Sequence, residues 1–352
     1  MEIKDLLKEL TDVPGISGYE APAAEVAASL MKPFSDEVDI DKQGSVIALK
    51  RGWQSGDKRD NILLAAHLDE IGLMVTKIED GGFMRITNVG GVDVCILPGQ
   101  AVKVFGKETV RGVIGAKPPH LQQPGDSGKP IQMDDLFIDT GKGKEELEKI
   151  IEIGAIVRIE SEFIELSNNC FAAQAMDDRS GVAVLVESLR RLMDRKHEWD
   201  VYAIATSQEE VSGLGAISSA FRLQPQIAIA IDVTFGDGPG LPERKAYPLG
   251  KGPAIGLGPN FHPKITKKLC DLASEYEIPY QVEADPYPGG TDAYSLQVSR
   301  AGVPAGLVSI PLRNMHTTVE MLKMDDIKRS AELLSVFISR LDSQFREDLR
   351  CF

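Results

Sequence analysis

The stretch AHLDEIG, residues 66–72, places a histidine two residues before an aspartate, directly after the apolar run NILLA. The chain has only five histidines. An imidazole at a strand end is commonly a hydrogen-bonded structural group, but it is also a metal ligand. Residues i and i+2 of a strand share a face, and a ligating histidine usually donates its other N–H to a carboxylate or carbonyl. Asp69 is therefore placed to orient His67. Whether His67 is a structural group or a metal ligand depends on whether the chain supplies further candidate ligands near it.

Further acidic and imidazole groups follow other apolar runs or open a helix: Asp177–Asp178, Glu209–Glu210, Asp232 and His316. Each has a simpler interpretation. Asp177–Asp178 fit a helix N-cap, and Glu209–Glu210 fit a solvated loop. Asp232 ends the run IAIAI, where an unpaired buried acid would be costly. The carboxyl ends of strands in an open α/β sheet meet at one rim, where ligands bind, so these groups are expected to converge.

Convergent imidazole and carboxylate groups suit Zn²⁺ or a similar first-row divalent ion. Asp177, Glu210 and Asp232 bring three negative charges against the four positive charges of two such ions. The balance leaves room for a bridging hydroxide, since bound cations lower the pKa of water. The residues therefore predict a site for two divalent metal ions.

The elements that would position these residues alternate between helix and strand. Ile3, Leu6, Leu7 and Leu10 recur at helical spacing. Strand-like and helical runs alternate from about residue 166 onward, which indicates a mixed α/β sheet buried on both faces. Residues 73–165 instead show short strands broken by Gly and Pro. We therefore expect a discontinuous catalytic domain, residues 1–72 and 166–352, with a small β-rich domain inserted at 73–165.

Composition excludes several classes of partner. The 352 residues carry a formal net charge of −14, which disfavours a nucleic-acid or anionic-membrane surface. The N-terminal stretch shows no secretory signal pattern, and the four cysteines are scattered without a CxxC. A cytoplasmic protein is expected. His197 and His262, in polar surroundings, are expected on the surface.

Several motifs occur in the order typical of the M42 metallo-aminopeptidases: AHLDEIG, MDDRSG, TSQEEVSGLGA, IAIDV, GKGPAI, PGGTDAYSL and IPLRNMHTTVE. The chain resembles this family over nearly its whole length. The resemblance implies a zinc-exopeptidase-like catalytic fold with helices on both sides of a mixed sheet. It further implies that the insert is a PDZ-like dimerisation domain, and that dimers assemble into a hollow dodecamer that admits short peptides.

Residue by residue, the resemblance implies that His67 and Asp232 bind one metal ion, Glu210 and His316 the other, and Asp177 both. Asp69 matches the acid that orients His67. Glu209 matches the general base that activates the water bridging the ions, which would be zinc, cobalt or manganese. Because neighbouring residues of an extended segment point in opposite directions, Glu209 and Glu210 are expected to divide the base and ligand roles.

The segment PGGTDA matches the substrate-side loop of the family and yields the candidates Gly289, Gly290, Thr291 and Asp292. Glycines there allow close backbone approach. Asp292 fits a helix cap equally well. His120 lies either near the site or in a surface loop, and the loop is the favoured interpretation.

The sequence departs from the family pattern at Ser212, Gly213, Leu214 and Asn314, which bears on pocket shape. Rival functions are an N-acyl amino-acid deacylase or carboxypeptidase on a similar site, an endoglucanase, and a catalytically silent scaffold. An endoglucanase needs two carboxyl groups flanking one sugar bond and has no use for paired histidines. A scaffold would be expected to have lost Glu209 or a ligand.

Overall fold

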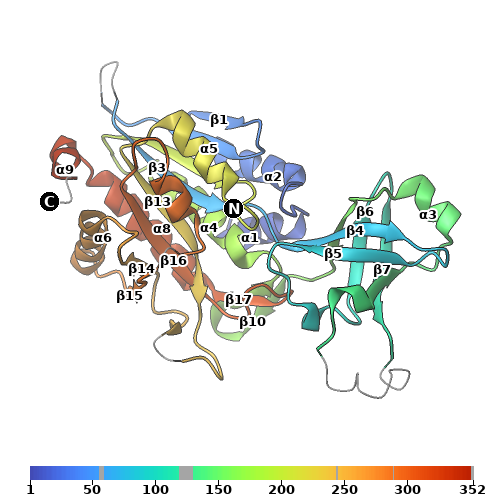
Figure 1. The fold of residues 1–352 in the computed structure, drawn as a ribbon. Helices are drawn as coiled ribbons and strands as arrows, with labels where there is room; N and C mark the ends of the chain where they lie inside the picture. The colour runs from blue at the N-terminus through green and yellow to red at the C-terminus, as the bar shows by residue number, and fades with distance from the viewer. Residues whose placement is uncertain (55–58, 119–129, 243–244, 288, 350–352) are drawn as a thin grey trace.

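The structure is a computed structural model that describes residues 1–54, 59–118, 130–242, 245–287 and 289–349. It consists of a larger α/β unit and a smaller β-barrel that projects from one side of it (Figure 1). Within the described part of the chain, every helix is too short or too polar to span a lipid bilayer.

The larger unit is built on an eight-stranded sheet in the order β1-β2-β12-β3-β13-β16-β14-β15. The central strands β12, β3, β13 and β16 run parallel, whereas β14 is antiparallel to β16. The sheet is therefore mixed. Its strands are β1 (Glu37–Ile40), β2 (Val46–Lys50), β3 (Asn61–His67), β12 (Asp200–Thr206), β13 (Ile227–Phe235), β14 (Ala254–Leu257), β15 (Gln281–Ala284) and β16 (Ala305–Leu312).

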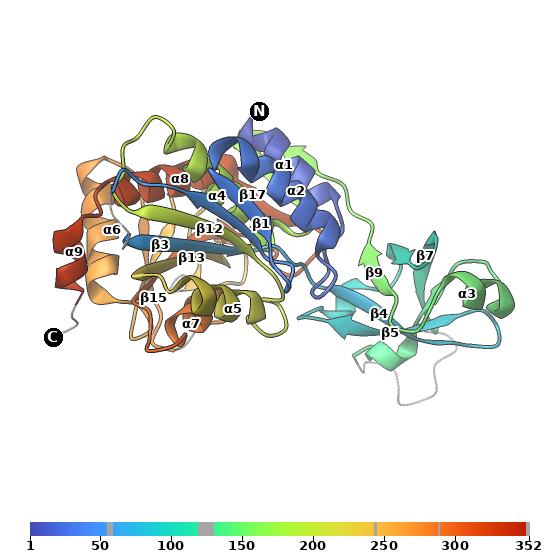
Figure 2. The same ribbon diagram turned by 90° about the horizontal axis from the view of Figure 1, so that it is seen from above.

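Helices cover both faces of this sheet (Figure 2). Alternate residues of β3 show why its sequence is apolar throughout. Ile62 and Leu64 belong to the core beneath α1, α2, α4 and α8, whereas Leu63 and Ala65 pack in the core beneath α5 and α7. The helices of this unit are α1 (Ile3–Asp12), α2 (Ala21–Met31), α4 (Met176–Arg191), α5 (Leu214–Leu223), α6 (Pro263–Glu275), α7 (Asp292–Gln297), α8 (Met324–Ser339) and α9 (Ser343–Asp348).

The barrel closes in the order β4-β5-β8-β7-β6-β9 around its own apolar core. Its elements are β4 (Gly72–Ile78), β5 (Met84–Val89), β6 (Ala101–Phe105), β7 (Thr109–Ala116), β8 (Leu136–Asp139), α3 (Lys144–Ile150) and β9 (Ile156–Ile159). Along β6, Val102 and Val104 are buried whereas Ala101 and Lys103 are exposed. The short strands expected in this region thus direct alternate apolar residues into a separate core.

A three-stranded sheet follows the barrel, in the order β10-β11-β17. Its strands are β10 (Ile164–Leu166), β11 (Cys170–Ala173) and β17 (Glu320–Lys323). The antiparallel register pairs Ala173 with Glu320. This pairing brings the segment that leads into α4 next to the segment that follows β16.

The barrel and the α/β unit are joined by buried ion pairs around Glu70. This carboxylate lies 2.9 Å from Nε of Arg158 on β9 and 3.3 Å from a terminal nitrogen of Arg179 on α4. It also accepts from the Gly15 amide at 2.9 Å. Arg179 is fully buried and donates to the carbonyls of Leu68, Leu10 and Val13. Glu70 and Arg179 together therefore hold the end of β3 against α1 and β9.

The mixed α/β fold expected from the sequence is confirmed, with a closed barrel beside it. The surface positions expected for His197 and His262 are wrong, because each residue is only 6% exposed. Their rings bond backbone carbonyls, His197 that of Trp199 and His262 that of Leu349. The polar residues beside them in sequence concealed these long-range and local contacts.

We expect Glu70→Gln to lower the free energy of unfolding by about 3–5 kcal/mol, because it leaves the buried Arg179 charge without a carboxylate. Urea unfolding followed by circular dichroism measures this change. Glu165→Gln is the matched control, since Glu165 pairs with Lys4 at the exposed surface. It should cost less than about 1 kcal/mol, and equal effects of the two variants would contradict the role of Glu70.

Candidate metal centre and active site

Neighbouring strands deliver the candidate residues to one edge of the sheet. His67 is the last residue of β3 and is paired with Thr206 at the end of β12. Glu209 and Glu210 follow β12 directly, Asp232 lies near the end of β13, and His316 follows β16. Because these strands are parallel, their carboxyl ends coincide, and Asp177 enters the same edge from the start of α4.

Ligand atoms from these residues form two groups that share one member. His67, Asp177 and Asp232 each offer an atom within 4.8 Å of the others, and so do Asp177, Glu210 and His316. Asp177 contributes one carboxylate oxygen to each side: Oδ1 lies 3.0 Å from Nε2 of His67, and Oδ2 lies 3.3 Å from Nε2 of His316. The structure thus brings together all five residues that the sequence nominated as ligands.

Both imidazoles direct Nε2 toward Asp177, while a backbone carbonyl holds the other ring nitrogen. Nδ1 of His67 bonds the Asp69 carbonyl at 3.2 Å, and the Asp69 carboxylate lies slightly farther away, at 3.6 Å. Nδ1 of His316 bonds the Gly91 carbonyl at 3.1 Å. With Nδ1–H donated in each case, the tautomer leaves Nε2 free to bind a cation.

The Asp69 carboxylate has a second task that sequence reasoning missed. Its Oδ1 accepts from the amide of Glu209 at 2.9 Å, and its Oδ2 accepts from the amide of Glu210 at 3.1 Å. The expectation of an extended segment at Glu209–Glu210 is wrong, because the two residues lie in a turn between β12 and α5. The Asp69 carboxylate fixes that turn, and with it the directions of both side chains.

Glu320, at the start of β17, is a further positioning residue that the sequence did not single out. It is buried, and its two oxygens accept from the amides of Asp177 at 3.1 Å and His316 at 2.8 Å. The only signal in the sequence is an acid at the end of the motif IPLRNMHTTVE. Its partners lie far away along the chain or in an irregular turn, so periodicity does not reveal them.

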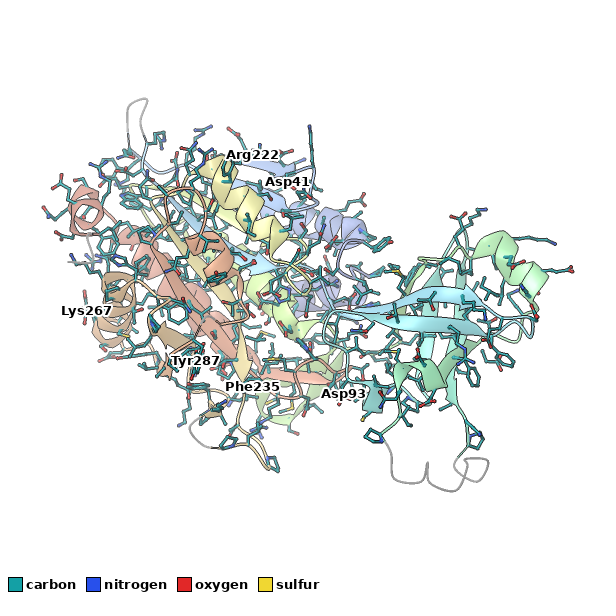
Figure 3. All side chains as sticks on the ribbon, viewed as in Figure 1. Asp41, Asp93, Arg222, Phe235, Lys267 and Tyr287 are labelled. Carbon is teal, nitrogen blue, oxygen red and sulfur yellow. The ribbon has the colours of Figure 1, made fainter. Side chains whose placement is uncertain are left out.

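The barrel also reaches the site. Gly91, in the segment after β5, supplies the carbonyl that bonds His316. A Cβ at this position would lie 2.8 Å from Nδ1 of the same ring, so only glycine allows the close approach. Figure 3 labels the nearby Asp93, where the barrel meets the α/β unit.

Burial and mutual repulsion perturb the acids of the site. Burial, together with the charges of neighbouring carboxylates, raises the pKa of Glu209 to about 8 and that of Glu210 to about 7. Burial and the charge of Asp178 raise the pKa of Asp232 well above its ordinary range. These shifts show that the site disfavours negative charge unless positive charge lies within it.

The imidazoles respond in the opposite direction. The hydrogen bond to Asp177 raises the pKa of His316 to about 9. Burial lowers the pKa of His67, but hydrogen bonds to the carboxylates of Asp177 and Asp69 outweigh it, so that the pKa rises. Protons on the two rings and cations bound between the acids would neutralise the same charge.

The donor set fits divalent cations. Three buried or half-buried carboxylates and two imidazoles form two groups, and the ligand atoms of each group lie within 4.8 Å of one another. Nitrogen and oxygen donors in this mixture match Zn²⁺ and similar first-row ions. Asp177 is the residue common to both groups.

A cavity of about 300 Å³ opens over these residues. Its lining includes Glu209, together with Gly289, Gly290 and Thr291 of the expected substrate loop. Asp292 is buried behind this lining and accepts a hydrogen bond from Thr206 at 2.5 Å. The N-cap of α7 is Thr291, whose hydroxyl accepts from the Ala293 amide, so the alternative that Asp292 caps this helix is wrong. His120 lies outside the described residues.

The positions that depart from the family pattern lie close to the ligands. Gly213 is the N-cap of α5 with φ +64°, and Ser212 caps the preceding turn through its bond to the Gln208 carbonyl. Asn314, two residues before His316, donates to the Val319 carbonyl at 3.2 Å. These residues shape the turns that carry Glu209, Glu210 and His316.

Comparison with known proteins supports the family resemblance. The model of the family described as M42 glutamyl aminopeptidase matches residues 44–333. The lysyl aminopeptidase of Pyrococcus furiosus is 37% identical over 342 residues, which cover 96% of this chain and 97% of that protein. The solved structure of an aminopeptidase from the archaeon Desulfurococcus kamchatkensis is 38% identical, has a TM-score of 0.91, and covers 99% of this chain and 97% of its own.

Two other solved structures bear on assembly and on rival functions. The TET1 peptidase of Pyrococcus horikoshii, described as assembling into a tetrahedron or a large octahedral shell, is 32% identical with a TM-score of 0.85 and covers 97% of this chain and all of its own. A Thermotoga maritima protein described as an endoglucanase is 33% identical with a TM-score of 0.78 and covers 98% of this chain and 99% of its own.

Glu320→Gln should weaken metal binding by about 10–100-fold, because an amide group accepts at one atom only and turns a donor toward one of the two backbone N–H groups. Titration of the metal-free protein with zinc in a competing chelator measures this affinity. Glu165→Gln, at an exposed carboxylate, should leave it unchanged. Equal zinc affinity in the wild type and Glu320→Gln would refute the positioning role.

Proposed function

The chain belongs to the M42 glutamyl aminopeptidase family, and we propose that this aminopeptidase removes N-terminal residues from short peptides with two divalent metal ions and Glu209 as general base. The observation that carries the proposal is the pair of ligand groups that share Asp177. The names of its relatives do not agree on a substrate residue, since one is a lysyl enzyme and the family is described as glutamyl.

In this proposal His67 and Asp232 hold one ion, Glu210 and His316 hold the other, and Asp177 holds both. Bound there, the ions would acidify a shared water and polarise the scissile carbonyl. Zinc fits the donors, and cobalt or manganese accept the same set. Asp69 and Glu320 keep the ligands in place through backbone amides.

Glu209 is proposed as the base because it lines the cavity but belongs to neither ligand group. Burial raises its pKa to about 8, and a base is most effective when its pKa lies near the working pH. It would take a proton from the attacking water and return it to the leaving amine. The turn fixed by Asp69 directs Glu209 and Glu210 into the same cavity for different tasks.

We further propose that residues 73–165 form a PDZ-like dimerisation domain, that residues 1–72 and 166–352 form the zinc-exopeptidase-like catalytic domain, and that dimers assemble into a dodecamer. The barrel has its own core and projects from the α/β unit (Figure 1). The described assembly of the TET1 relative supports a closed shell. Such a shell would admit short peptides and exclude folded proteins.

Glu209→Gln should lower kcat by about 10²–10⁴-fold, because the amide cannot accept a proton from water. Hydrolysis of aminoacyl-p-nitroanilides measures the loss, and metal analysis should find the metal content of the wild type. Removing the metal should abolish wild-type activity, and zinc should restore it. An acetylated peptide tested in parallel separates an aminopeptidase from a deacylase, and activity retained by Glu209→Gln would refute the base.

Sedimentation velocity should give a particle close to twelve times the mass of one chain. Arg111 is exposed on β7 of the barrel, so Arg111→Glu should leave the fold intact. The same sedimentation measurement on this variant tests whether the barrel surface takes part in assembly. A monomer at micromolar concentration in the wild type would contradict the proposed dodecamer without affecting the proposed chemistry.

A further inference from the structure

The cavity over the candidate ligands has a second polar wall that the proposed reaction does not use. Glu283, Asp285 and Ser309 line it, and none of them belongs to either ligand group. Glu283 lies on β15, Asp285 directly follows this strand, and Ser309 lies on β16. Strand β14 therefore separates Glu283 and Asp285 from the strands that carry the candidate ligands, whereas Ser309 lies beside those ligands, and all three residues line the same cavity.

The sheet register explains why these side chains share that cavity. Ser309 is paired directly with Asp232 on one side and with Ala254 on the other, and Glu283 is paired with Gly256, two residues beyond Ala254. Residues paired across strands, and residues two apart along a strand, point to the same face. Ala254 and Gly256, the residues of β14 between Ser309 and Glu283, are both small.

Hydrogen bonding fixes one end of the Glu283 carboxylate and leaves the other available. Its Oε1 accepts from the Thr234 hydroxyl at 2.6 Å. Its Oε2 is buried and has no hydrogen-bond partner among the described residues. The Ser309 hydroxyl, in a residue that is 1% exposed, lies beside the same carboxylate, and this contact lowers the pKa of Glu283 against the effect of burial. A carboxylate has four lone-pair sites, so Glu283 keeps acceptor capacity for a ligand in the cavity that it lines.

The chemistry of the wall favours a cation. Glu283 and Asp285 are both acidic, and the residues that line the cavity include no lysine or arginine among the described part of the chain. Burial raises the pKa of Glu283, and the charge of Asp285 raises it further. A positive group bound between them would offset this cost.

The approach to this wall is apolar. Leu307, Phe235 and Met315 also line the cavity, and Figure 3 shows Phe235 and Tyr287 on the same side of the α/β unit. Thr234 lies two residues beyond Asp232, so about 7 Å of β13 separates the candidate ligand from the partner of Glu283. An aliphatic stem with a charged end suits such a path.

Resting on the proposed aminopeptidase function, we propose that Glu283, supported by Asp285 and Ser309, binds the side chain of the substrate's N-terminal residue and selects lysine or arginine. Glu283 is a specificity-determining residue, and Thr234 positions its carboxylate. An N-terminal glutamate would meet two like charges in a partly desolvated cavity and is expected to be a poor substrate.

The test compares lysyl-, leucyl- and glutamyl-p-nitroanilide as substrates of the zinc-loaded enzyme. The wild type should show a kcat/KM for the lysyl substrate at least about tenfold above the other two. Glu283→Gln keeps an acceptor for Thr234 and should lower kcat/KM for the lysyl substrate by about 10–100-fold, with the leucyl substrate changed less than about threefold. Ser309→Ala should lower the lysyl value by about 2–10-fold.

Glu275→Gln is the matched control, since this carboxylate is exposed on α6, and it should change neither substrate. A parallel loss for lysyl and leucyl substrates in Glu283→Gln would overturn the proposal, because it would mean that Glu283 acts on the amine or on the fold. The same conclusion would follow from equal wild-type rates on all three substrates, whereas inactivity on every substrate would overturn the proposed function.

Calorimetric binding of free lysine and norleucine to the zinc-loaded protein keeps the two proposals distinguishable, because it does not require turnover. The wild type should bind lysine at least about tenfold more tightly than norleucine, and Glu283→Gln should abolish that difference. Equal binding of the two amino acids by the wild type would overturn the lysine and arginine selectivity, whatever the enzymatic result.

Discussion

Carboxylates buried side by side at the edge of a sheet are stable only when positive charge lies among them. In this protein Asp177 meets that requirement with an imidazole on each oxygen. Glu210 and Asp232 lie at the two outer sides, and both have raised pKa values. The arrangement of the surrounding chain follows from this charge, since the imidazoles, the backbone amides and the proposed cations all compensate it.

Two further carboxylates position the site through hydrogen bonds to the main chain. Asp69 accepts from the amides of Glu209 and Glu210, and Glu320 accepts from those of Asp177 and His316. Side chains of the site are thus fixed at their backbones, where hydrogen bonds leave little freedom. Supports of this kind hold a site to the precision that catalysis needs.

Much of the fold and most of the candidate ligands could be predicted, because parallel strands bring their carboxyl ends to one edge. His67, Asp232 and His316 each follow or end an apolar run that the sequence displays openly. The positioning role of Glu320 and the hydrogen bonds that Asp69 accepts from backbone amides could not be predicted. They join segments that no local sequence pattern relates. The same holds for Glu283: β15 is a four-residue strand of alternating burial, too short to stand out, and its partner Thr234 lies in β13, far away along the chain.

The contact between Gly91 and His316 ties the small barrel to the reaction centre. Without the barrel, Nδ1 of His316 would lose the carbonyl that accepts its hydrogen bond, and with it one of the contacts that orient this imidazole. The barrel thus contributes directly to the candidate metal centre. A contact that shifts the barrel, such as one with a neighbouring subunit, would therefore change the orientation of the His316 ring.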